Sequence, residues 1–435
     1  MNTETHQAIN AVWRIEQAKL VAGLARMVRD IGVAEELAQD ALVVALERWP
    51  ETGIPDNPGA WLMATAKRRA IDRIRHLKMQ DRKHAEIGYG LDLEQEDVAD
   101  EIEARLDDDI GDDLLKLVFT ACHPVLSREA RVALTLRLIG GLSTAEIARA
   151  FFVPEPTIAQ RIVRAKRTLA DSDIAYEVPR GEALAERLAS VCEVIYLIFN
   201  EGYAATAGED WIRPQLAQEA VRLGRILAGL APAEPEVFGL VALMEIQSSR
   251  FAARIGPDGE PVLLLDQNRA RWDHLLIRRG LAALARAEAL GPRGPYALQA
   301  AIAACHARAA RADQTDWRRI ADLYAELMAL TPSPVVELNR AVAVSMVDGP
   351  AAGLAIVETL AGGSVLAASH LLPGVRADFL MKLGRFAEAK ADFERAADLT
   401  RNAREQSLLR ARAAECEAGI TGRTATRLAS SGGTA

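Results

Sequence analysis

The sequence predicts an all-α protein. Apolar residues recur at helical spacing along nearly the whole chain, alanine is very common, and strand-like alternation is scarce. Aromatic residues make up only 5% of the chain, which also argues against a β-rich fold. The clearest exception is the segment 251–266, where Gly256-Pro257-Asp258-Gly259 separates two short apolar runs. That pattern predicts a hairpin or an ordered loop.

Length and composition exclude several classes of protein. The 435 residues suffice for about three domains of roughly 150 residues each. Half of the residues are apolar and 26% are charged, as expected for a soluble globular chain rather than a disordered one. We expect neither a secretory signal at the start nor a membrane span, because the longest apolar runs are far shorter than the roughly 20 residues that a bilayer requires.

The four cysteines predict reduced thiols rather than a metal site. Cys122, Cys192, Cys305 and Cys416 are widely spaced and form no C-x-x-C pair. We therefore expect buried thiols in a cytoplasmic protein, with no bound metal and no cofactor.

Charge is distributed unevenly along the chain. The formal net charge of −8 argues, taken alone, against a nucleic-acid-binding protein. However, residues 85–113 hold 13 acidic residues against one arginine, whereas residues 61–84 and 114–171 carry about +6 and +5. The sequence thus predicts two basic helical modules joined by an extended acidic linker.

The second basic module has the pattern of a helix-turn-helix. Ser143-Thr144-Ala145-Glu146 has the form of a capping box, and it opens a short helix. A second helix follows Pro154-Glu155-Pro156, and its apolar stripe is Ile158, Ile162, Ala165 and Leu169. The opposite face carries the groups that a recognition helix offers to the major groove: Thr157, Gln160, Arg161, Arg164 and Arg167. An ordinary αα-hairpin is the alternative interpretation.

The first basic module begins with an acidic helix. The helix is expected to run from Ala34 to Trp49 with Leu37, Ala41, Val44 and Ala45 buried. Another face of this helix carries Glu35, Glu36, Gln39, Asp40 and Val43. A Pro/Gly-rich loop, 50–58, leads into a second helix that contains Trp61 and a run of basic residues to Arg75.

At this point the sequence resembles the extracytoplasmic-function (ECF) class of bacterial RNA polymerase sigma factors. The motif A-E-E-L-A-Q-D resembles region 2.2, P-x-A-W-L followed by A-I-D-x-x-R resembles regions 2.3 and 2.4, and L-S-T-A-E-I-A followed by T-I-A-Q-R-I-x-R-A-K-R resembles region 4.2. The resemblance covers residues 11–78 and 112–170. The gap of about 34 residues between the two modules is too short for the extra domain of housekeeping sigma factors.

The resemblance implies partners and site residues. It implies that RNA polymerase core, through the clamp helices of its largest subunit and its flap, and promoter DNA are the partners. The core-binding residues would be Glu35, Glu36, Gln39, Asp40 and Val43. The −10 element would be contacted by Asp56, Asn57, Lys67, Arg68, Arg69, Arg73 and Arg75, with Asn57 suited to a flipped base and the cations to the DNA backbone. The −35 element would be contacted by the five residues of the recognition helix. For Trp61 we favour packing in the core over stacking on a base.

The C-terminal part predicts stacked helical hairpins. Gly384, Phe386, Ala389, Phe393 and Ala396 follow a tetratricopeptide-like spacing, and Ala341, Val344, Gly353 and Val357 form a looser copy. This part resembles the extension of one ECF subgroup, through segments around Asn200–Tyr203, Glu245, Arg250 and Asp266–Asp273. Those residues fit a buried polar network, a ligand or peptide pocket, or, least well, a catalytic site.

The domains are accordingly expected at 1–84 (sigma region 2), 85–113 (acidic linker), 114–172 (sigma region 4), 173–420 (helical regulatory domain) and 421–435 (disordered tail). The predicted function is that of an ECF sigma factor, not an enzyme, that binds core polymerase, selects promoters, helps to melt the −10 element and is regulated in cis by its C-terminal domain. The alternative is a helix-turn-helix transcriptional regulator that is not a sigma factor and carries a protein-binding solenoid.

Overall fold

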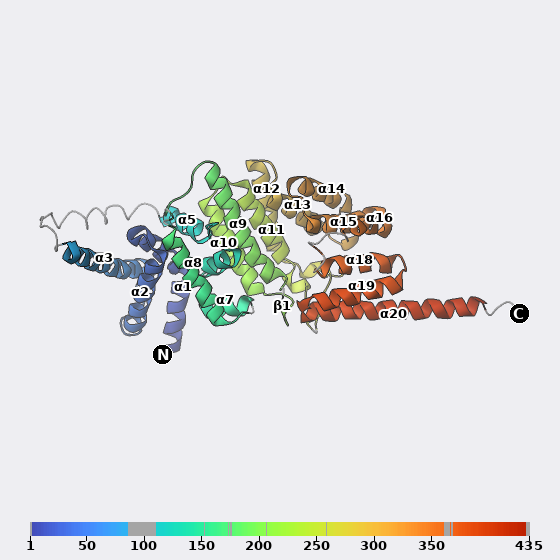
Figure 1. Cartoon of the computed structure of the whole chain (residues 1–435), viewed down its shortest axis with the longest axis horizontal. Coiled ribbons are helices and arrows are strands. Elements are labelled where there is room, and N and C mark those ends of the chain that lie inside the picture. Colours follow the sequence, from blue (N-terminus) through green and yellow to red (C-terminus); the bar gives the residue numbers. More distant parts are fainter. Residues whose placement is uncertain are drawn as a thin grey trace. The chain divides into compact units, whose positions relative to one another are not determined.

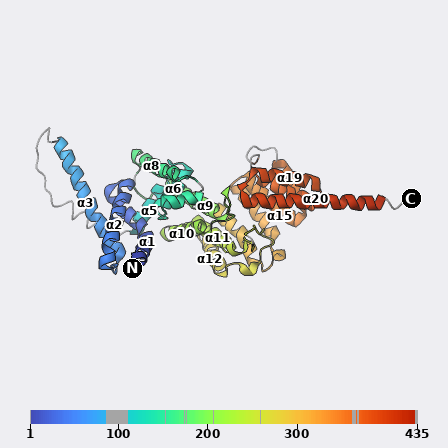
Figure 2. The same ribbon diagram turned by 90° about the horizontal axis from the view of Figure 1, so that it is seen from below.

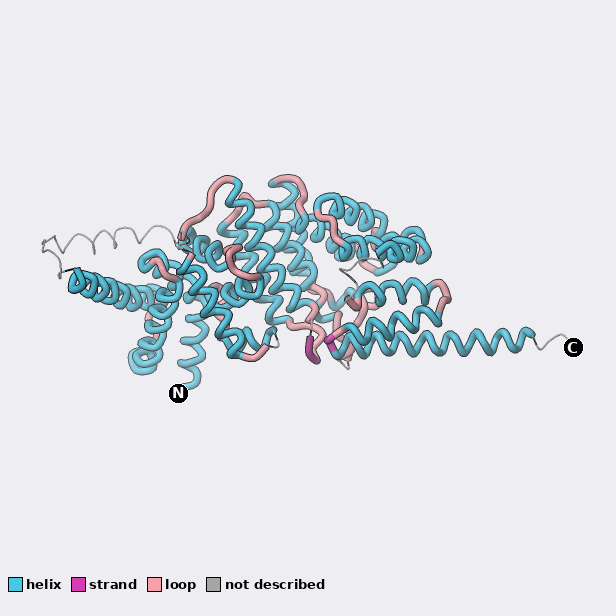
Figure 3. Tube along the Cα trace, in the orientation of Figure 1, coloured by secondary structure: helices cyan, strands magenta, loops and turns pink. Residues whose placement is uncertain are grey.

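The fold is all-α, as predicted. The computed structural model describes residues 2–85, 110–151, 153–172, 174, 176–205, 207–257, 259–360, 366 and 369–431. Helices dominate the described chain, and two two-residue strands are the exception (Figure 1 and Figure 3). Among the described helices, none is long and apolar enough to cross a lipid bilayer.

The chain forms two compact units, Met1–Leu197 and Ile198–Ala435. The first unit comprises α1 (Asn2–Val28), α2 (Ile31–Thr52), α3 (Pro58–Ala85), α5 (Ile110–Ala121), α6 (Arg128–Leu138), α7 (Thr144–Phe151), α8 (Glu155–Asp171) and the first part of α9 (Glu182–Tyr203). The second unit holds the rest of α9, α10 (Pro214–Leu230), α11 (Pro235–Ser248), α12 (His274–Leu290), α13 (Pro295–Arg308), α14 (Trp317–Leu330), α15 (Pro334–Asp348), α16 (Pro350–Leu360), α18 (Leu371–Lys382), α19 (Phe386–Leu399) and α20 (Ala403–Ser431). It also holds the short 3₁₀ helices η1 (Phe251–Ala253), η2 (Arg269–Arg271) and η3 (Ala312–Gln314) and the strands β1 (Ala207–Gly208) and β2 (Arg401–Asn402).

Helices α1, α2 and α3 pack against one another in the first unit. Helix α2 begins three residues earlier than expected because the Asp30 side chain accepts a hydrogen bond from the Val33 amide (3.0 Å) and caps the helix there. The predicted stripe is buried at Leu37, Ala41 and Ala45. Trp61 packs edge-on against the buried Trp49 with ring centroids 5.3 Å apart, which supports its predicted packing role, and its own side chain is half-buried.

Helices α5 to α8 form the second part of this unit, and α5 packs on α1 (Figure 2). Helix α6 is capped by the Ser127 hydroxyl, which accepts from the Ala130 amide at 3.3 Å. Helices α6, α7 and α8 contact one another in pairs. The α6 core includes Leu134, Leu136 and Leu138, all fully buried.

The first compact unit continues past residue 172, the expected end of the second basic module. The first part of α9 packs on α5 and α6: Arg187 donates to the Phe119 carbonyl (2.6 Å), and the Ser190 hydroxyl donates to the Cys122 carbonyl (2.8 Å). These bonds satisfy carbonyl groups at the C-terminal end of α5 that have no hydrogen-bond partner within the helix. The compact unit therefore extends to Leu197 rather than ending after the recognition helix.

The second unit is a series of helices in which neighbours along the chain pack on each other. The predicted repeat positions Ala341, Val357, Ala389 and Phe393 are all buried in one apolar cluster. Gly353 lies in a close crossing, where an added Cβ would be 2.6 Å from the Ser345 side chain. Glycines with positive φ, Gly349 and Gly384, occupy the turns after α15 and α18. The helical-hairpin arrangement thus follows the small/large pattern of the sequence.

The described residues of the segment 251–266 fit the hairpin or ordered loop expected there. Ile255 and Pro261 make an antiparallel bridge, and the Gly256 amide donates to the Glu260 carbonyl at 2.9 Å. Elsewhere in this unit β1 pairs in parallel with β2, with Ala207 opposite Arg401. The buried Asn402 amide holds that pairing by donating to the carbonyls of Ala205 (3.0 Å) and Asp210 (2.8 Å).

The C-terminal tail differs from the expectation. It was expected to be disordered from residue 421, but α20 continues to Ser431, and residues 423–431 contain neither Pro nor Gly to end the helix. Most of the acidic linker, residues 86–109, lies outside the described residues, as do residues 432–435.

The cysteine expectation is met at three positions. Cys122, Cys192 and Cys416 are buried and free, whereas Cys305 is half-buried. Burial raises the pKa of the Cys122 thiol to about 11, which keeps it protonated and unreactive.

The crossing of α11 and α13 provides a test of the packing in the second unit. An added Cβ at Gly239 would be 2.6 Å from the Ala297 amide nitrogen, whereas one at Gly229, in the exposed last turn of α10, would meet nothing within 4 Å. We expect Gly239→Ala to lower the free energy of unfolding by about 1–3 kcal/mol through overpacking. Gly229→Ala should be neutral or stabilise by about 0.5–1 kcal/mol, because alanine restricts the unfolded chain. Chemical denaturation of both variants checks this, and equal effects of the two substitutions would contradict the close crossing.

Candidate nucleic-acid interface

The helix-turn-helix is formed by α7 and α8, and its start has the predicted capping box. The Glu146 carboxylate accepts from the Ser143 amide (2.8 Å), and the Glu146 amide donates to the Ser143 hydroxyl (3.2 Å). Helix α8 begins after Pro154, with Pro156 in its first turn, where the missing amide proton costs no helical bond.

Helix α8 has one buried and one exposed face. Ile158, Ile162, Ala165 and Leu169 are buried, as predicted. Gln160, Arg164 and Arg167 are exposed on the outer face, and Thr157 and Arg161 are half-buried beside it. The structure therefore brings the five predicted −35 residues onto one surface of one helix. The three exposed side chains have the donors that base edges and phosphates accept.

Val163 also lies on this surface and is absent from the predicted set of −35 residues. Its side chain is 65% exposed, although it is apolar, and it lies one helical turn from Gln160 and Arg167. An apolar group on a recognition helix suits the methyl group of thymine. The available signal was its position outside the stripe of Ile158, Ile162 and Leu169.

The second predicted DNA-contacting surface lies on α3 and the loop before it. Arg68, Arg73 and Arg75 are exposed, and Lys67 and Arg69 are half-buried. Asp56 and Asn57 are exposed in the loop. The Asn57 side-chain oxygen accepts from the Ala60 amide at 3.1 Å and so caps α3. That bond fixes the orientation of the Asn57 amide, whose nitrogen points away from the cap.

Acidic residues of α2 pair with these cations. Arg69 pairs with Asp40 (2.9 Å), and Arg73 pairs with Glu36 (3.3 Å). The structure thus places part of the predicted core-binding surface next to part of the predicted −10 surface. Both pairs are largely exposed, so each contributes at most about 1 kcal/mol and can exchange for other partners.

The five predicted core-binding residues do not share one environment. Glu36, Asp40 and Val43 are exposed, and Gln39 is half-buried. Glu35, in contrast, is only 2% exposed. It accepts from Arg137 of α6 (2.6 Å) and from Gln39 (2.8 Å), and it also pairs with Lys166 of α8. In this arrangement Glu35 faces the helix-turn-helix part of the same unit, which corrects its expected place on the exposed face of α2.

A second cluster of polar residues lies in the C-terminal unit. Arg254 stacks on the Tyr203 ring, with 3.7 Å between the guanidinium carbon and the ring centroid, and donates to the Tyr203 carbonyl at the end of α9. Arg269 donates to the carbonyls of His306 and Ala309 (both 2.6 Å) at the end of α13. These cations thus neutralise the negative ends of two helices.

Aromatic side chains belong to the same network, and a further ion cluster lies around Glu245 of α11. Trp272 is buried, with the guanidinium carbons of Arg269 and Arg250 at 4.9 and 5.9 Å from its ring centroid. The buried Glu245 pairs with Arg225 (2.7 Å) and Arg279 (3.6 Å). Of the interpretations that the sequence left open for this cluster, these contacts favour a buried polar network that fixes the helix ends. Among the described residues no group of His, Cys, Asp and Glu has the arrangement of a metal site.

Three family models match separate parts of the chain. The family model for Sigma-70 region 2 matches residues 14–79, that for Sigma-70, region 4 matches residues 116–169, and a family of unknown function (DUF6596) matches residues 187–288. The two sigma matches coincide with the two modules delimited above.

Curated relatives agree with these matches. An uncharacterized protein of Rhizobium meliloti (strain 1021) is 44% identical over 394 residues, which are 90% of this chain and 91% of that protein. The ECF RNA polymerase sigma factor SigK of Mycobacterium ulcerans is 32% identical over 151 residues, 34% of this chain and 75% of that protein. The probable ECF RNA polymerase sigma factor SigI of Mycobacterium tuberculosis is 32% identical over 177 residues, 40% of this chain and 58% of that protein.

The histidine of the C-terminal cluster predicts a pH dependence. Burial, together with Arg250 and Arg269, lowers the pKa of His306 from 6.5 to about 3. The unfolded chain takes up a proton at this position below about pH 6.5 and the folded chain does not, so stability falls as the pH drops from 6.5 towards 3, by at most about 1.4 kcal/mol per pH unit. We expect His306→Gln to flatten the dependence of the free energy of unfolding between pH 7 and pH 5. The exposed His274→Gln is the control for loss of a histidine, and equal slopes in wild type and His306→Gln would refute the assignment.

Proposed function

Since this chain belongs to the ECF sigma factors of bacterial RNA polymerase, with a long helical C-terminal domain, we propose that it binds core polymerase, directs it to specific promoters and helps to melt their −10 element. The single observation that carries this proposal is the exposed cationic face of α8 within a helix-turn-helix. As a transcription factor acting with the polymerase, it would work in the cytoplasm, and we propose no catalytic role for it.

Recognition of the −35 element is assigned to the outer face of α8. Gln160 and Arg164 lie in the part of the helix that can reach base edges, and Arg167 follows one turn from Arg164 near its end. A bidentate arginine contact to guanine contributes about 1–3 kcal/mol of discrimination. Val163 would add contact with thymine.

Core binding and promoter melting are assigned to α2 and α3. Glu36, Asp40 and Val43 form the exposed surface offered to the clamp helices of the polymerase. The cations Arg68, Arg73 and Arg75 would hold the phosphates of the opened strand. The ion pairs Arg69–Asp40 and Arg73–Glu36 connect the two surfaces, so that a partner of either one competes for the same side chains.

The C-terminal unit is assigned a regulatory role in cis. It is a compact unit with its own apolar core, and the rhizobial relative matches the chain across most of it. Helical-hairpin arrays commonly offer extended surfaces for binding, so a protein or small-molecule ligand of this unit is part of the proposal.

Transcription in a purified system tests promoter recognition. Full-length protein with core polymerase should give run-off transcripts from a subset of genomic fragments, and no transcript should form without the protein. Arg164→Ala should reduce these transcripts about tenfold, since it removes one major-groove contact. Arg180→Ala, an exposed arginine in the loop before α9, is the matched control. If the Arg164→Ala variant supports as much transcription as the Arg180→Ala variant, the assignment of α8 is wrong. If the protein binds promoter DNA without core polymerase, that result would instead favour a regulator that is not a sigma factor.

Removal of the C-terminal unit tests regulation in cis. A chain that ends at Leu197 retains every helix of the first unit up to the unit boundary. We expect its transcript yield, or its choice of promoters, to differ from those of the full-length chain at equal occupancy of core polymerase. Far-UV circular dichroism and core affinity of the shortened chain control for misfolding. Identical yields from identical promoters would remove the regulatory role.

A further inference from the structure

We propose that Glu35, Arg137 and Lys166 form a latch that holds the two sigma regions together in the free chain and opens when the chain engages a promoter. This inference rests on the proposed function and adds a conformational step to it. The latch joins α2 of region 2 to α6 and α8 of region 4. Glu35 is separated from each of its two partners by more than 100 positions in the sequence.

The latch is centred on a buried carboxylate. Glu35 is 2% exposed, whereas the side chains of Arg137 and Lys166 are each 23% exposed. The Arg137 guanidinium donates to the carboxylate at 2.6 Å, and the Lys166 ammonium pairs with its second oxygen. Two cations thus compensate one anion where water is excluded, which is the condition under which a buried charge is tolerated.

Further polar contacts hold the same parts together. The Gln17 amide of α1 donates to the Arg137 carbonyl at 3.0 Å. The Tyr176 hydroxyl, in the segment after α8, lies 3.0 Å from the carbonyls of both Ala22 in α1 and Asp113 in α5. The association of the two regions is therefore specific in its hydrogen bonding.

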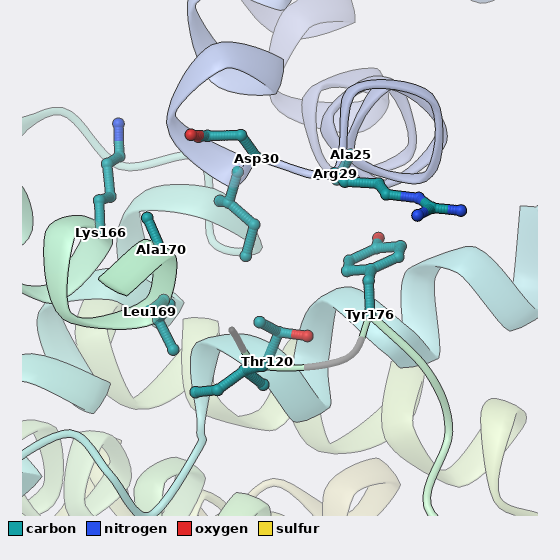
Figure 4. A pocket seen from close by; sticks show the side chains of 10 residues that line it. Ala25, Arg29, Asp30, Thr120, Lys166, Leu169, Ala170 and Tyr176 are labelled. Carbon is teal, nitrogen blue, oxygen red and sulfur yellow. The ribbon is translucent and has the colours of Figure 1, made fainter. Parts of the chain in front are cut away.

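A cavity at the same place shows that the apolar packing is incomplete. It is lined by Asp30 and Ile31 at the start of α2, by Lys166 and Leu169 of α8, and by Tyr176 (Figure 4). Figure 4 shows Lys166 beside the turn that holds Asp30, with Tyr176 on the other side of the cavity. Atoms that line a void lack dispersion contacts on that side. Polar groups thus carry the contact of α2 with α6 and α8, whereas α1 also packs on α5. The polar groups can exchange their partners for water when the regions separate.

The latched arrangement cannot contact both promoter elements. By their names the −10 and −35 elements lie about 25 base pairs apart, or roughly 85 Å at 3.4 Å per base pair. A latch at hydrogen-bonding distance places α8 directly against α2, and even the whole of α3, with 28 residues, is only about 42 Å long. Since α3 would read one element and α8 the other, the two regions must separate.

The energetics of the latch suit a reversible step. When a buried ion cluster forms, the attraction between its charges replaces their hydration, so the net contribution of the cluster to stability is small. Removal of one partner, in contrast, leaves the remaining charges uncompensated. Opening therefore costs little at the ion cluster itself when all three groups become hydrated together, and separation of the regions must in addition give up the contact of α1 with α5. Reversing the charge of Glu35 converts two attractions into two repulsions and should favour the open form.

Energy transfer within the full-length chain tests the latch. Dyes are attached through unnatural amino acids at Glu51, at the end of α2, and at Ser172, just after α8; both positions are exposed. We expect high energy transfer in the wild type. In Glu35→Lys the ratio of closed to open molecules should be at least about tenfold lower, because Arg137 and Lys166 lose their anionic partner and face a third cation. The triple variant Glu35→Lys, Arg137→Glu, Lys166→Glu should recover transfer. Glu47→Lys, an exposed charge reversal on the same helix, should leave transfer unchanged.

The outcomes separate the latch from the proposed function. Unchanged transfer in Glu35→Lys, or a triple variant that stays open, overturns the latch even if the protein supports transcription. Transfer that falls in Glu35→Lys and recovers in the triple variant supports the latch even if core polymerase never binds, in which case the sigma function itself fails. With the wild type, addition of core polymerase and promoter DNA should lower transfer, and constant transfer in an active promoter complex overturns the opening step. Far-UV circular dichroism of Glu35→Lys establishes that lost transfer reflects separation rather than unfolding.

Discussion

The carboxylate of Glu35 determines how the first unit presents its functional surfaces. This buried anion pairs with Arg137 and Lys166, so it acts together with the buried apolar stripe of α8 to orient that helix about its axis. With Lys166 directed to region 2 and the apolar stripe directed to α6 and α7, the remaining face of α8 must be exposed. Gln160, Arg164 and Arg167 occupy that face.

The same interaction divides the acidic residues of α2 into two groups. Neighbouring positions on a helix are about 100° apart, so when Glu35 faces region 4, Glu36 faces elsewhere. Glu36 and Asp40 are exposed, and they pair with Arg73 and Arg69 of α3. The acidic motif therefore serves one buried and one exposed purpose, and the exposed pairs are weak enough to yield to a polymerase or to DNA.

The C-terminal unit handles its buried cations in a different way. Arg254 and Arg269 donate to carbonyls at helix C-termini and lie over aromatic rings. Here the helix dipoles and the aromatic ring faces supply the negative potential. Around Arg137 and Lys166 of the first unit, the Glu35 carboxylate supplies it. A charge held in this way carries no readily exchanged counter-ion, which fits a structural role within this unit.

The local features of this protein could be predicted from its sequence alone, because they depend on periodicity and on short-range hydrogen bonds. The all-α class, the capping box of Ser143 and Glu146, the stripe of α8 and the helical hairpins around Phe393 all follow from residues close together in the chain. The packing of the helices in space was needed to show that Glu35 is buried and that α9 belongs in part to the first unit. Each of these depends on partners that are distant in sequence, such as Arg137 and Lys166 for Glu35. A helical pattern predicts which face of a helix is apolar, but it does not predict which element lies against the polar faces.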